Sequence, residues 1–216
     1  MSEPSHRPVD VLPRLYGITD RACAARGVGT TADAVEAALE GGLTMLQFRD
    51  KERSDARVWS LAKRIRRVCA GTGVRLLVNA RADIASLLDA DGVHRPSDGL
   101  PVDILRRVLD GGLVGASCHD HEELTDAEQA GADFATLSPV FPTDSKPGYG
   151  PPLGLRQFSE LASSVDIPVY ALGGITPDRA EDCLEAGAHG VAAMSGIMAA
   201  DAPKRAVERY LQALDS

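Results

Sequence analysis

The chain has 216 residues, of which 44% are hydrophobic and 25% are charged, and its formal net charge at pH 7 is −8. This length fits one domain, and the hydrophobic content is sufficient for a sizeable core. Because the chain is acidic and contains no run of Lys or Arg, binding to double-stranded nucleic acid is not expected. An anionic ligand would need a local site built for it.

Several features of the sequence predict a cytoplasmic protein that does not enter a membrane. No apolar run reaches the roughly 18 residues of a membrane span. The first residues lack the basic region and the apolar stretch of a secretory signal. The four cysteines, Cys23, Cys69, Cys118 and Cys183, are scattered along the chain, which is typical of proteins in a reducing compartment.

From residue 15 onward, the sequence alternates short β-rich runs with helical stretches. The predicted strands are Leu15–Thr19, Met45–Arg49, Leu76–Asn79, Gly92–His94, Leu113–Ser117, Phe134–Leu137, Val169–Leu172 and Val191–Met194. The helical stretches include Thr31–Glu40, Asp55–Cys69, Val102–Leu109, Leu155–Ser163, Asp178–Ala186 and Lys204–Leu214. Eight such alternations predict a single (β/α)8 barrel over residues 15–216, with residues 1–14 as a flexible lead-in. An open doubly wound sheet is the alternative.

Glycines follow the seventh and eighth predicted strands. Gly173 and Gly174 end the seventh, and Met194, Ser195 and Gly196 end the eighth. In barrels of this kind the chemistry takes place at the C-terminal ends of the strands, and exposed backbone amides in such loops bind phosphate. We therefore predict a phosphate site here. The alternative is that the glycine pair only forms a tight turn.

The second predicted strand ends with polar side chains. Strand alternation places Gln47, Arg49 and Lys51 on one side, facing the mouth of the barrel. Two cations buried together are costly unless an anion meets them, so this end of the strand predicts a second anion site. The alternative is that Lys51 has left the strand and is a solvated loop residue.

A long loop rich in Gly and Pro, residues 138–150, follows the sixth predicted strand. It carries Lys146 with hydroxyl side chains nearby, Thr143 and Ser145. Such a loop is typical of a lid that brings a cation onto a phosphate. The alternative is a mobile surface loop.

The third, fourth and fifth predicted strands end at Asn79, His94 and Ser117, and Cys118 and His119 come next in the chain. All five are expected to face the mouth. His94 and His119 are candidates for acid–base chemistry, or for hydrogen-bonded residues at its rim.

The chain resembles the thiamine-phosphate synthase/TenI family over nearly its whole length. The segments that carry the resemblance are Leu15-Tyr16-Gly17-Ile18-Thr19-Asp20, Gln47-Phe48-Arg49-Asp50-Lys51, Ala90-Asp91-Gly92-Val93-His94, Gly131-Ala132-Asp133-Phe134, Pro139-Val140-Phe141-Pro142-Thr143 and Ala171-Leu172-Gly173-Gly174-Ile175. The resemblance implies a (β/α)8 enzyme of thiamine biosynthesis. Synthases of the family join hydroxymethylpyrimidine diphosphate to a thiazole phosphate and release pyrophosphate. By resemblance, the diphosphate is held by Gln47, Arg49, Lys51, Asn79, Ser117, Thr143 and Lys146, and the thiazole phosphate by Gly174 and Ser195.

The sequence departs from the synthase pattern at the two aspartates that bind magnesium. Ala80 and Gly99 stand at those positions, and Asp98 is the one remaining candidate ligand. Mg²⁺ is therefore expected only if the chain is an active synthase. Arg95 is a candidate for supplying positive charge in place of the metal.

These departures favour a TenI-like thiazole tautomerase, which moves a proton on a carboxylated thiazole phosphate and needs no diphosphate departure. The histidine that tautomerases carry after the sixth strand is replaced by Pro139, so His94, His119 and Cys118 are the candidate bases. The alternatives are a thiamine-phosphate synthase and a non-catalytic protein that senses a phosphorylated ligand. The predicted partner is a small phosphorylated thiazole, joined in a synthase by a pyrimidine diphosphate. A homodimer is compatible with the sequence.

Overall fold

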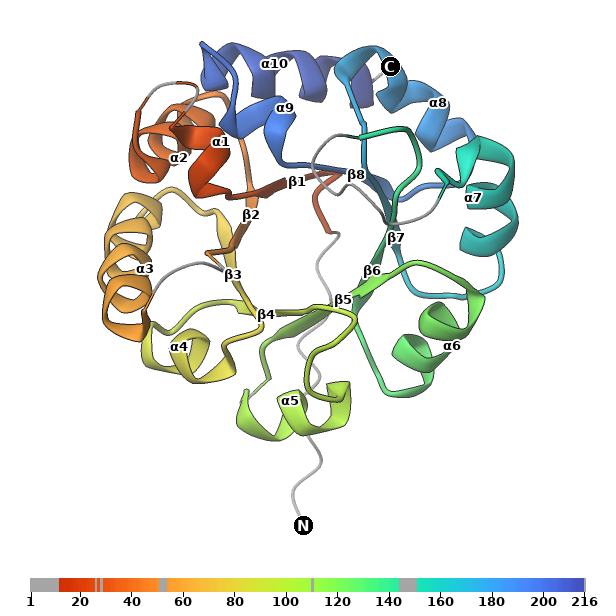
Figure 1. Ribbon diagram of the computed structural model, residues 1–216, viewed down its shortest axis with the longest axis horizontal. Helices are drawn as coiled ribbons and strands as arrows, with labels where there is room; N and C mark the ends of the chain where they lie inside the picture. Colours follow the sequence, from red (N-terminus) through yellow and green to blue (C-terminus); the bar gives the residue numbers. More distant parts are fainter. Residues whose placement is uncertain are drawn as a thin grey trace.

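The computed structural model describes residues 12–25, 27, 29–50, 54–109, 111–143 and 151–215. Its eight strands pair in parallel, each with its neighbour in the chain, and β1 pairs with β8 to close a barrel (Figure 1). The strands are β1 (Leu15–Ile18), β2 (Met45–Phe48), β3 (Arg75–Asn79), β4 (Gly92–Arg95), β5 (Leu113–Cys118), β6 (Phe134–Leu137), β7 (Val169–Leu172) and β8 (Gly190–Ala193). The predicted (β/α)8 barrel is confirmed, and the open sheet is wrong.

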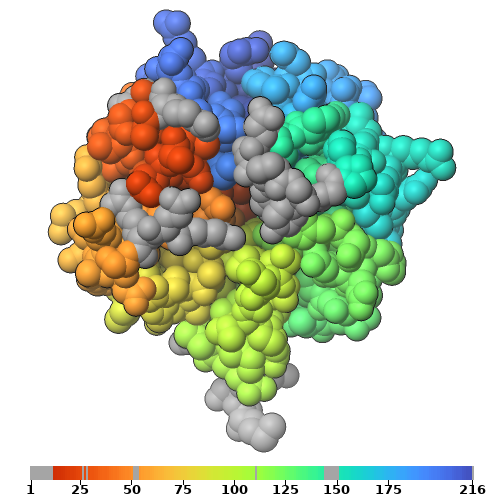
Figure 2. Space-filling view, in the orientation of Figure 1, coloured from red at the N-terminus to blue at the C-terminus, as the bar shows by residue number. Residues whose placement is uncertain are grey.

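The helices form a ring outside the barrel, following one another around it in sequence order (Figures 1 and 2). They are α1 (Arg21–Ala24), α2 (Thr31–Glu40), α3 (Asp55–Cys69), α4 (Ala82–Leu87), α5 (Val102–Val108), α6 (His121–Gln129), α7 (Gly154–Ala162), η1 (Pro177–Arg179), α8 (Ala180–Glu185), α9 (Ser195–Met198) and α10 (Pro203–Leu214). Capping residues mark the start of several of these helices. Thr30 and Asp33, for example, form a reciprocal capping box at the start of α2. Within the described part of the chain, no helix has both the length and the apolar character to cross a membrane.

Aromatic and aliphatic side chains fill the interior of the barrel. The residues that pack there are Leu12, Tyr16, Ile18, Met45, Leu77, Phe134, Tyr170 and Ala192. Tyr16 and Phe134 meet edge to face with their ring centroids 5.5 Å apart, and Phe134 meets Tyr170 in the same way. Because the interior is packed and not open, ligands are limited to its C-terminal end.

Residues 12–14 close the opposite end of the barrel. Leu12 is only 2% exposed, and its carbonyl oxygen accepts a 2.8 Å hydrogen bond from His189 Nε2. The Tyr170 hydroxyl donates to the Pro13 carbonyl, and Arg14 Nη1 donates to the Leu214 carbonyl. The prediction of a flexible lead-in through residue 14 is therefore wrong for residues 12–14, which belong to the packed fold. Residues 1–11 lie outside the described part of the chain.

Candidate functional site

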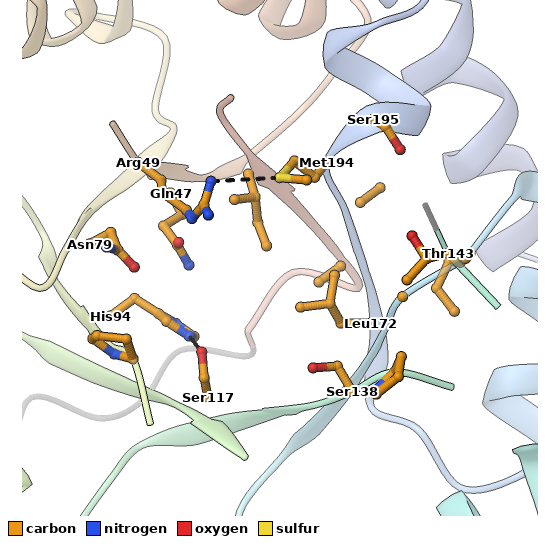
Figure 3. Close-up of a pocket in the computed structure, with 18 of the residues that line it drawn as sticks. Gln47, Arg49, Asn79, His94, Ser117, Ser138, Thr143, Leu172, Met194 and Ser195 are labelled. Atoms are coloured by element: carbon orange, nitrogen blue, oxygen red, sulfur yellow. Dashed lines mark hydrogen bonds between the residues drawn. The ribbon is translucent and has the colours of Figure 1, made fainter. Parts of the chain in front are cut away.

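A pocket opens at the C-terminal ends of the strands, enclosing about 1020 Å³ when its open mouth is included. Its lining includes Gln47, Arg49, Asn79, His94, Asp98, Ser117, His119, Ser138, Thr143, Gly173, Gly174, Met194, Ser195 and Gly196. Figure 3 shows Gln47, Arg49 and Asn79 on one side of a common space, with Thr143 and Ser195 on the other. The structure therefore brings together two groups of residues that the sequence places far apart.

The glycines after β7 have left-handed backbone angles and closely packed neighbours. Gly173 has φ of 97° and Gly174 has φ of 65°. A Cβ atom on Gly174 would lie 2.5 Å from the Pro142 carbonyl oxygen and 2.8 Å from Phe141 Cβ. The chain after β6 also hydrogen-bonds to this turn, through Phe141 N and the Gly173 carbonyl at 3.0 Å. Packing against residues 139–142 thus accounts for the glycines in part, in addition to any ligand they admit.

Tyr210 on α10 supports both glycine-containing loops from behind. Its buried hydroxyl donates to the Ile175 carbonyl oxygen at 2.8 Å. A Cβ atom on Gly196 would collide with the same hydroxyl oxygen. Burial raises the pKa of Tyr210 to about 12, so its phenol keeps the proton that it donates. Sequence reasoning missed Tyr210, because a tyrosine on an amphipathic helix carries no signal of such a role.

Arg49 points into the pocket, as predicted, but an anionic side chain already faces it. Arg49 Nη1 lies 3.0 Å from Asp20 Oδ2 and 4.0 Å from Met194 Sδ. Burial alone would raise the pKa of Asp20, but its hydrogen bonds to Cys23 and its contact with the Arg49 guanidinium hold the pKa below its usual value. Arg49 is therefore a partly neutralised cation. The sequence did not predict Asp20 as a site residue, because Asp20 follows β1 whereas Arg49 follows β2.

Four polar side chains form a continuous row from the barrel interior to the pocket. Gln47 Nε2 donates to the Tyr16 hydroxyl oxygen at 3.1 Å, and this oxygen lies 3.3 Å from His94 Nδ1. His94 Nε2 lies 3.0 Å from Ser117 Oγ (Figure 3). His94 is 1% exposed, and both of its ring nitrogens have partners. It is a buried network residue, which does not suit a general base that must meet a substrate.

His119 and Cys118 follow one another in the chain, but they face different surroundings. His119 lines the pocket, and its Nδ1 lies 2.8 Å from Glu123 Oε2. Cys118 lies on the alternate face of β5, where its thiol donates to the Glu123 carbonyl oxygen at 3.4 Å. Burial raises the pKa of the Cys118 thiol to about 12. The interpretation of Cys118 as a residue of the mouth and a candidate base is therefore wrong.

Three predicted site residues, Lys51, Ser145 and Lys146, lie outside the described part of the chain. Their roles remain predictions from the sequence.

Comparison with known proteins gives a consistent result. A family model described as thiamine monophosphate synthase matches residues 15–197. A thiamine-phosphate synthase of Caldivirga maquilingensis is 40% identical over 205 residues, covering 94% of this chain and 98% of that protein. The chain belongs to the thiamine-phosphate synthase/TenI family.

Other members of the family support the same assignment. A putative thiamine-phosphate synthase 2 of Aquifex aeolicus is 42% identical over 85% of this chain and 97% of its own length. The solved structure of a thiamine phosphate pyrophosphorylase from Pyrococcus furiosus has a TM-score of 0.83 and 32% identity, covering 94% of this chain and 95% of that one. These relatives have synthase-type names, so they give no support to the predicted preference for the tautomerase branch.

The described residues do not fit the two-aspartate magnesium site that resemblance to the family's synthases implies. Ala80 and Gly99 supply no side-chain oxygen, and Asp98 is an exposed carboxylate at the edge of the pocket. Within the described ranges, no group of three His, Cys, Asp or Glu side chains is arranged to hold a metal. Magnesium prefers several oxygen ligands, including carboxylates, which one exposed aspartate does not supply.

Arg95 does not replace the metal either. Its Nε donates to the Leu100 carbonyl and its Nη2 to the Ser97 carbonyl, each at 3.1 Å. Arg95 therefore stabilises its own loop and is not part of the pocket lining. The hypothesis that it supplies charge to the mouth is wrong.

Proposed function

We propose that this protein joins hydroxymethylpyrimidine diphosphate to a thiazole phosphate and releases pyrophosphate, as a thiamine-phosphate synthase. The observation that carries the proposal is the pairing of two polar regions across one pocket. Gln47, Arg49 and Asn79 lie on one side, and Thr143 and Ser195 lie on the other (Figure 3). Ser117 and Gly174 line the same pocket. A reaction between two phosphorylated substrates needs two such regions, whereas a tautomerase needs one. The synthase names of the relatives support the same choice.

The pocket residues match the charge changes of this reaction. The bond between the pyrimidine methylene carbon and the diphosphate oxygen breaks, and its electron pair leaves with the diphosphate. A bond from the thiazole ring to that carbon forms. Hydrogen-bond donors that are already fixed in place stabilise the charge developing on the leaving group. Arg49 and the Ser117 hydroxyl are such donors, and they are held by Asp20 and His94.

The described residues supply too few ligands for a metal ion to take part in the proposed reaction. Asp98 is the single acidic side chain among the described residues that line the pocket. In place of a metal ion, the proposal assigns the stabilisation of the leaving group's charge to Arg49, Lys51 and Lys146. The roles of Lys51 and Lys146 rest on the sequence alone.

A second candidate, thiazole tautomerase activity, rests on one observation. His119 faces the pocket with Nδ1 against the Glu123 carboxylate at 2.8 Å, and this pairing orients an imidazole for proton transfer. A tautomerase would convert a carboxylated thiazole phosphate without a second substrate.

One experiment separates these functions. The purified protein is incubated with both synthase substrates, with and without magnesium, and pyrophosphate and thiamine phosphate are measured. We expect both products in equal amounts. An Arg49→Gln variant should lose at least about tenfold in rate, because hydrogen bonds to charged groups contribute about 1.5–3 kcal/mol. Arg57→Gln, a change at an exposed site on α3, is the matched control and should keep the rate.

Other outcomes would contradict the synthase proposal. Conversion of the thiazole phosphate alone would favour the tautomerase. Binding of both ligands without turnover would favour the non-catalytic sensor.

We also propose a cytoplasmic location, in keeping with four buried cysteines that form no disulfide. A homodimer remains a prediction.

A further inference from the structure

With the Gln47 amide nitrogen facing Tyr16, as in this structure, the row of polar side chains from Gln47 to Ser117 has one hydrogen-bond direction that satisfies every member. Gln47 Nε2 is a donor, so the Tyr16 oxygen accepts from it. Tyr16 is fully buried, and its phenol proton needs an acceptor. His94 Nδ1, 3.3 Å away, is that acceptor when the ring is neutral and its proton is on Nε2. Nε2–H then donates to Ser117 Oγ.

The opposite direction leaves a buried proton without an acceptor. If His94 Nδ1 carried the proton, Tyr16 would accept from both Gln47 and His94, and its own hydroxyl hydrogen would point into the packed interior. A buried donor without an acceptor costs about 1–3 kcal/mol. Burial also raises the pKa of Tyr16 well above its usual value, so loss of the phenol proton does not resolve the conflict.

The direction of the row decides what Ser117 offers to a ligand. A serine hydroxyl has one hydrogen. When Ser117 Oγ accepts from His94, that hydrogen is available to donate into the pocket, which Ser117 lines. When Ser117 must donate to His94 instead, only lone pairs face the pocket, and these repel an anion.

We propose that Tyr16 and His94 are positioning residues that hold the Ser117 hydroxyl as a hydrogen-bond donor to the bound diphosphate. This inference rests on the proposed function for the identity of the anion. Neither ring is free to turn away. Phe134 lies edge to face with Tyr16 at 5.5 Å and packs against His94 at 5.8 Å, between ring centroids. The four residues lie on β1, β2, β4 and β5, and Tyr16 and Ser117 are 101 positions apart in the sequence. The row therefore exists only in the folded barrel.

The first test reads the tautomer of His94 directly, without ligand or substitution. Two-bond ¹H–¹⁵N correlation spectra of the wild-type protein at neutral pH distinguish protonated from unprotonated ring nitrogens. The His94 signals are assigned by their loss in His94→Gln. We expect a neutral ring with the proton on Nε2. A proton on Nδ1, or a charged ring, would overturn the inference whatever reaction the protein performs.

The second test is a double-mutant cycle that measures pyrophosphate binding by calorimetry. Ser117→Ala should weaken binding about tenfold or more, because it removes a hydrogen bond to an anion. Tyr16→Phe should weaken binding about three- to tenfold and make the His94 signals show both tautomers. The double variant should bind about as weakly as Ser117→Ala alone, because both changes remove one interaction.

Tyr170→Phe is the matched control, because it also removes a hydroxyl from the barrel interior but at the end closed by Pro13. It should leave binding and the His94 signals unchanged. Additive effects of Tyr16→Phe and Ser117→Ala would overturn the positioning role, since they would indicate a general structural effect. If the wild type binds no pyrophosphate while His94 carries its proton on Nε2, the proposed function fails and the diphosphate contact fails with it, but the direction of the row stands.

Discussion

Replacing Ala80 with glycine should stabilise the protein. Ala80 has φ of 61°, a left-handed conformation that is unfavourable for a residue with a Cβ atom, and its side chain is exposed. The conformation costs a non-glycine residue about 1–2 kcal/mol. Glycine removes that cost, but it gives the unfolded chain about 0.4–1 kcal/mol more entropy. The difference is a net gain of roughly 0.5–1 kcal/mol, since exposure makes the loss of the methyl group nearly neutral.

Thermal and denaturant unfolding measure this gain. For a chain of this size, about 1 kcal/mol corresponds to roughly 2–4 °C in melting temperature, so Ala80→Gly should raise it by about 1–4 °C. Ala37→Gly, in the middle of α2, is the control and should destabilise by about 1 kcal/mol. Equal destabilisation by both substitutions would refute the left-handed conformation at residue 80 or the cost assigned to it.

Ala80→Asp extends the same reasoning to the site. Aspartate enters the left-handed region more readily than alanine, so this variant should be no less stable than the wild type. It also adds a carboxylate where the family's synthases carry a magnesium ligand by resemblance. Magnesium with pyrophosphate should therefore raise the melting temperature of Ala80→Asp more than that of the wild type. An equal response in both proteins would contradict this expectation.

Three further predictions concern other positions. Gly174→Val should weaken thiazole-phosphate binding and lower stability, because its side chain would collide with the Pro142 carbonyl; unchanged affinity by calorimetry would show that the site is misplaced. Because the pKa of Asp20 is depressed in the folded state, its contribution to stability is present above its unfolded pKa near 3.9 and is lost as the pH falls through the folded value. Asp20→Asn should therefore make the free energy of unfolding depend less on pH at acidic pH. Arg49→Gln should act in the same direction, because it removes the cation that helps to lower the pKa of Asp20. Cys118→Ala should keep full activity, and the wild-type thiol should stay unreactive toward thiol reagents until the protein unfolds.

The fold was predictable because its signals are local. Short β-rich runs alternating with helices predicted all eight strands, with ends within a residue or two of those observed. Strand parity also placed Gln47 and Arg49 correctly on the pocket side. The expectation that Cys118 faces the mouth is wrong because it disregarded this alternation. Cys118 directly follows the inward-facing Ser117, so alternation turns it to the outer face of β5.

The partners of the site residues were much harder to predict. Asp20 and Arg49 follow the paired strands β1 and β2, whereas Tyr16 on β1 reaches His94 on β4 across the barrel interior. No spacing in the sequence encodes these contacts. The left-handed backbone at Ala80 could not be predicted either. A glycine or an asparagine at this position would have indicated such a conformation, but an alanine does not.

Because the floor of the barrel is closed, the pocket has one opening for all of its ligands. Leu12 seals the end opposite the pocket, and the rings of Tyr16, Phe134 and Tyr170 fill the space between. A molecule that reaches the floor of the pocket must therefore leave through the opening by which it entered. Under the proposed reaction, both substrates enter and both products leave through this one opening. A product that stays bound would occupy the place of the next substrate and would inhibit the reaction competitively.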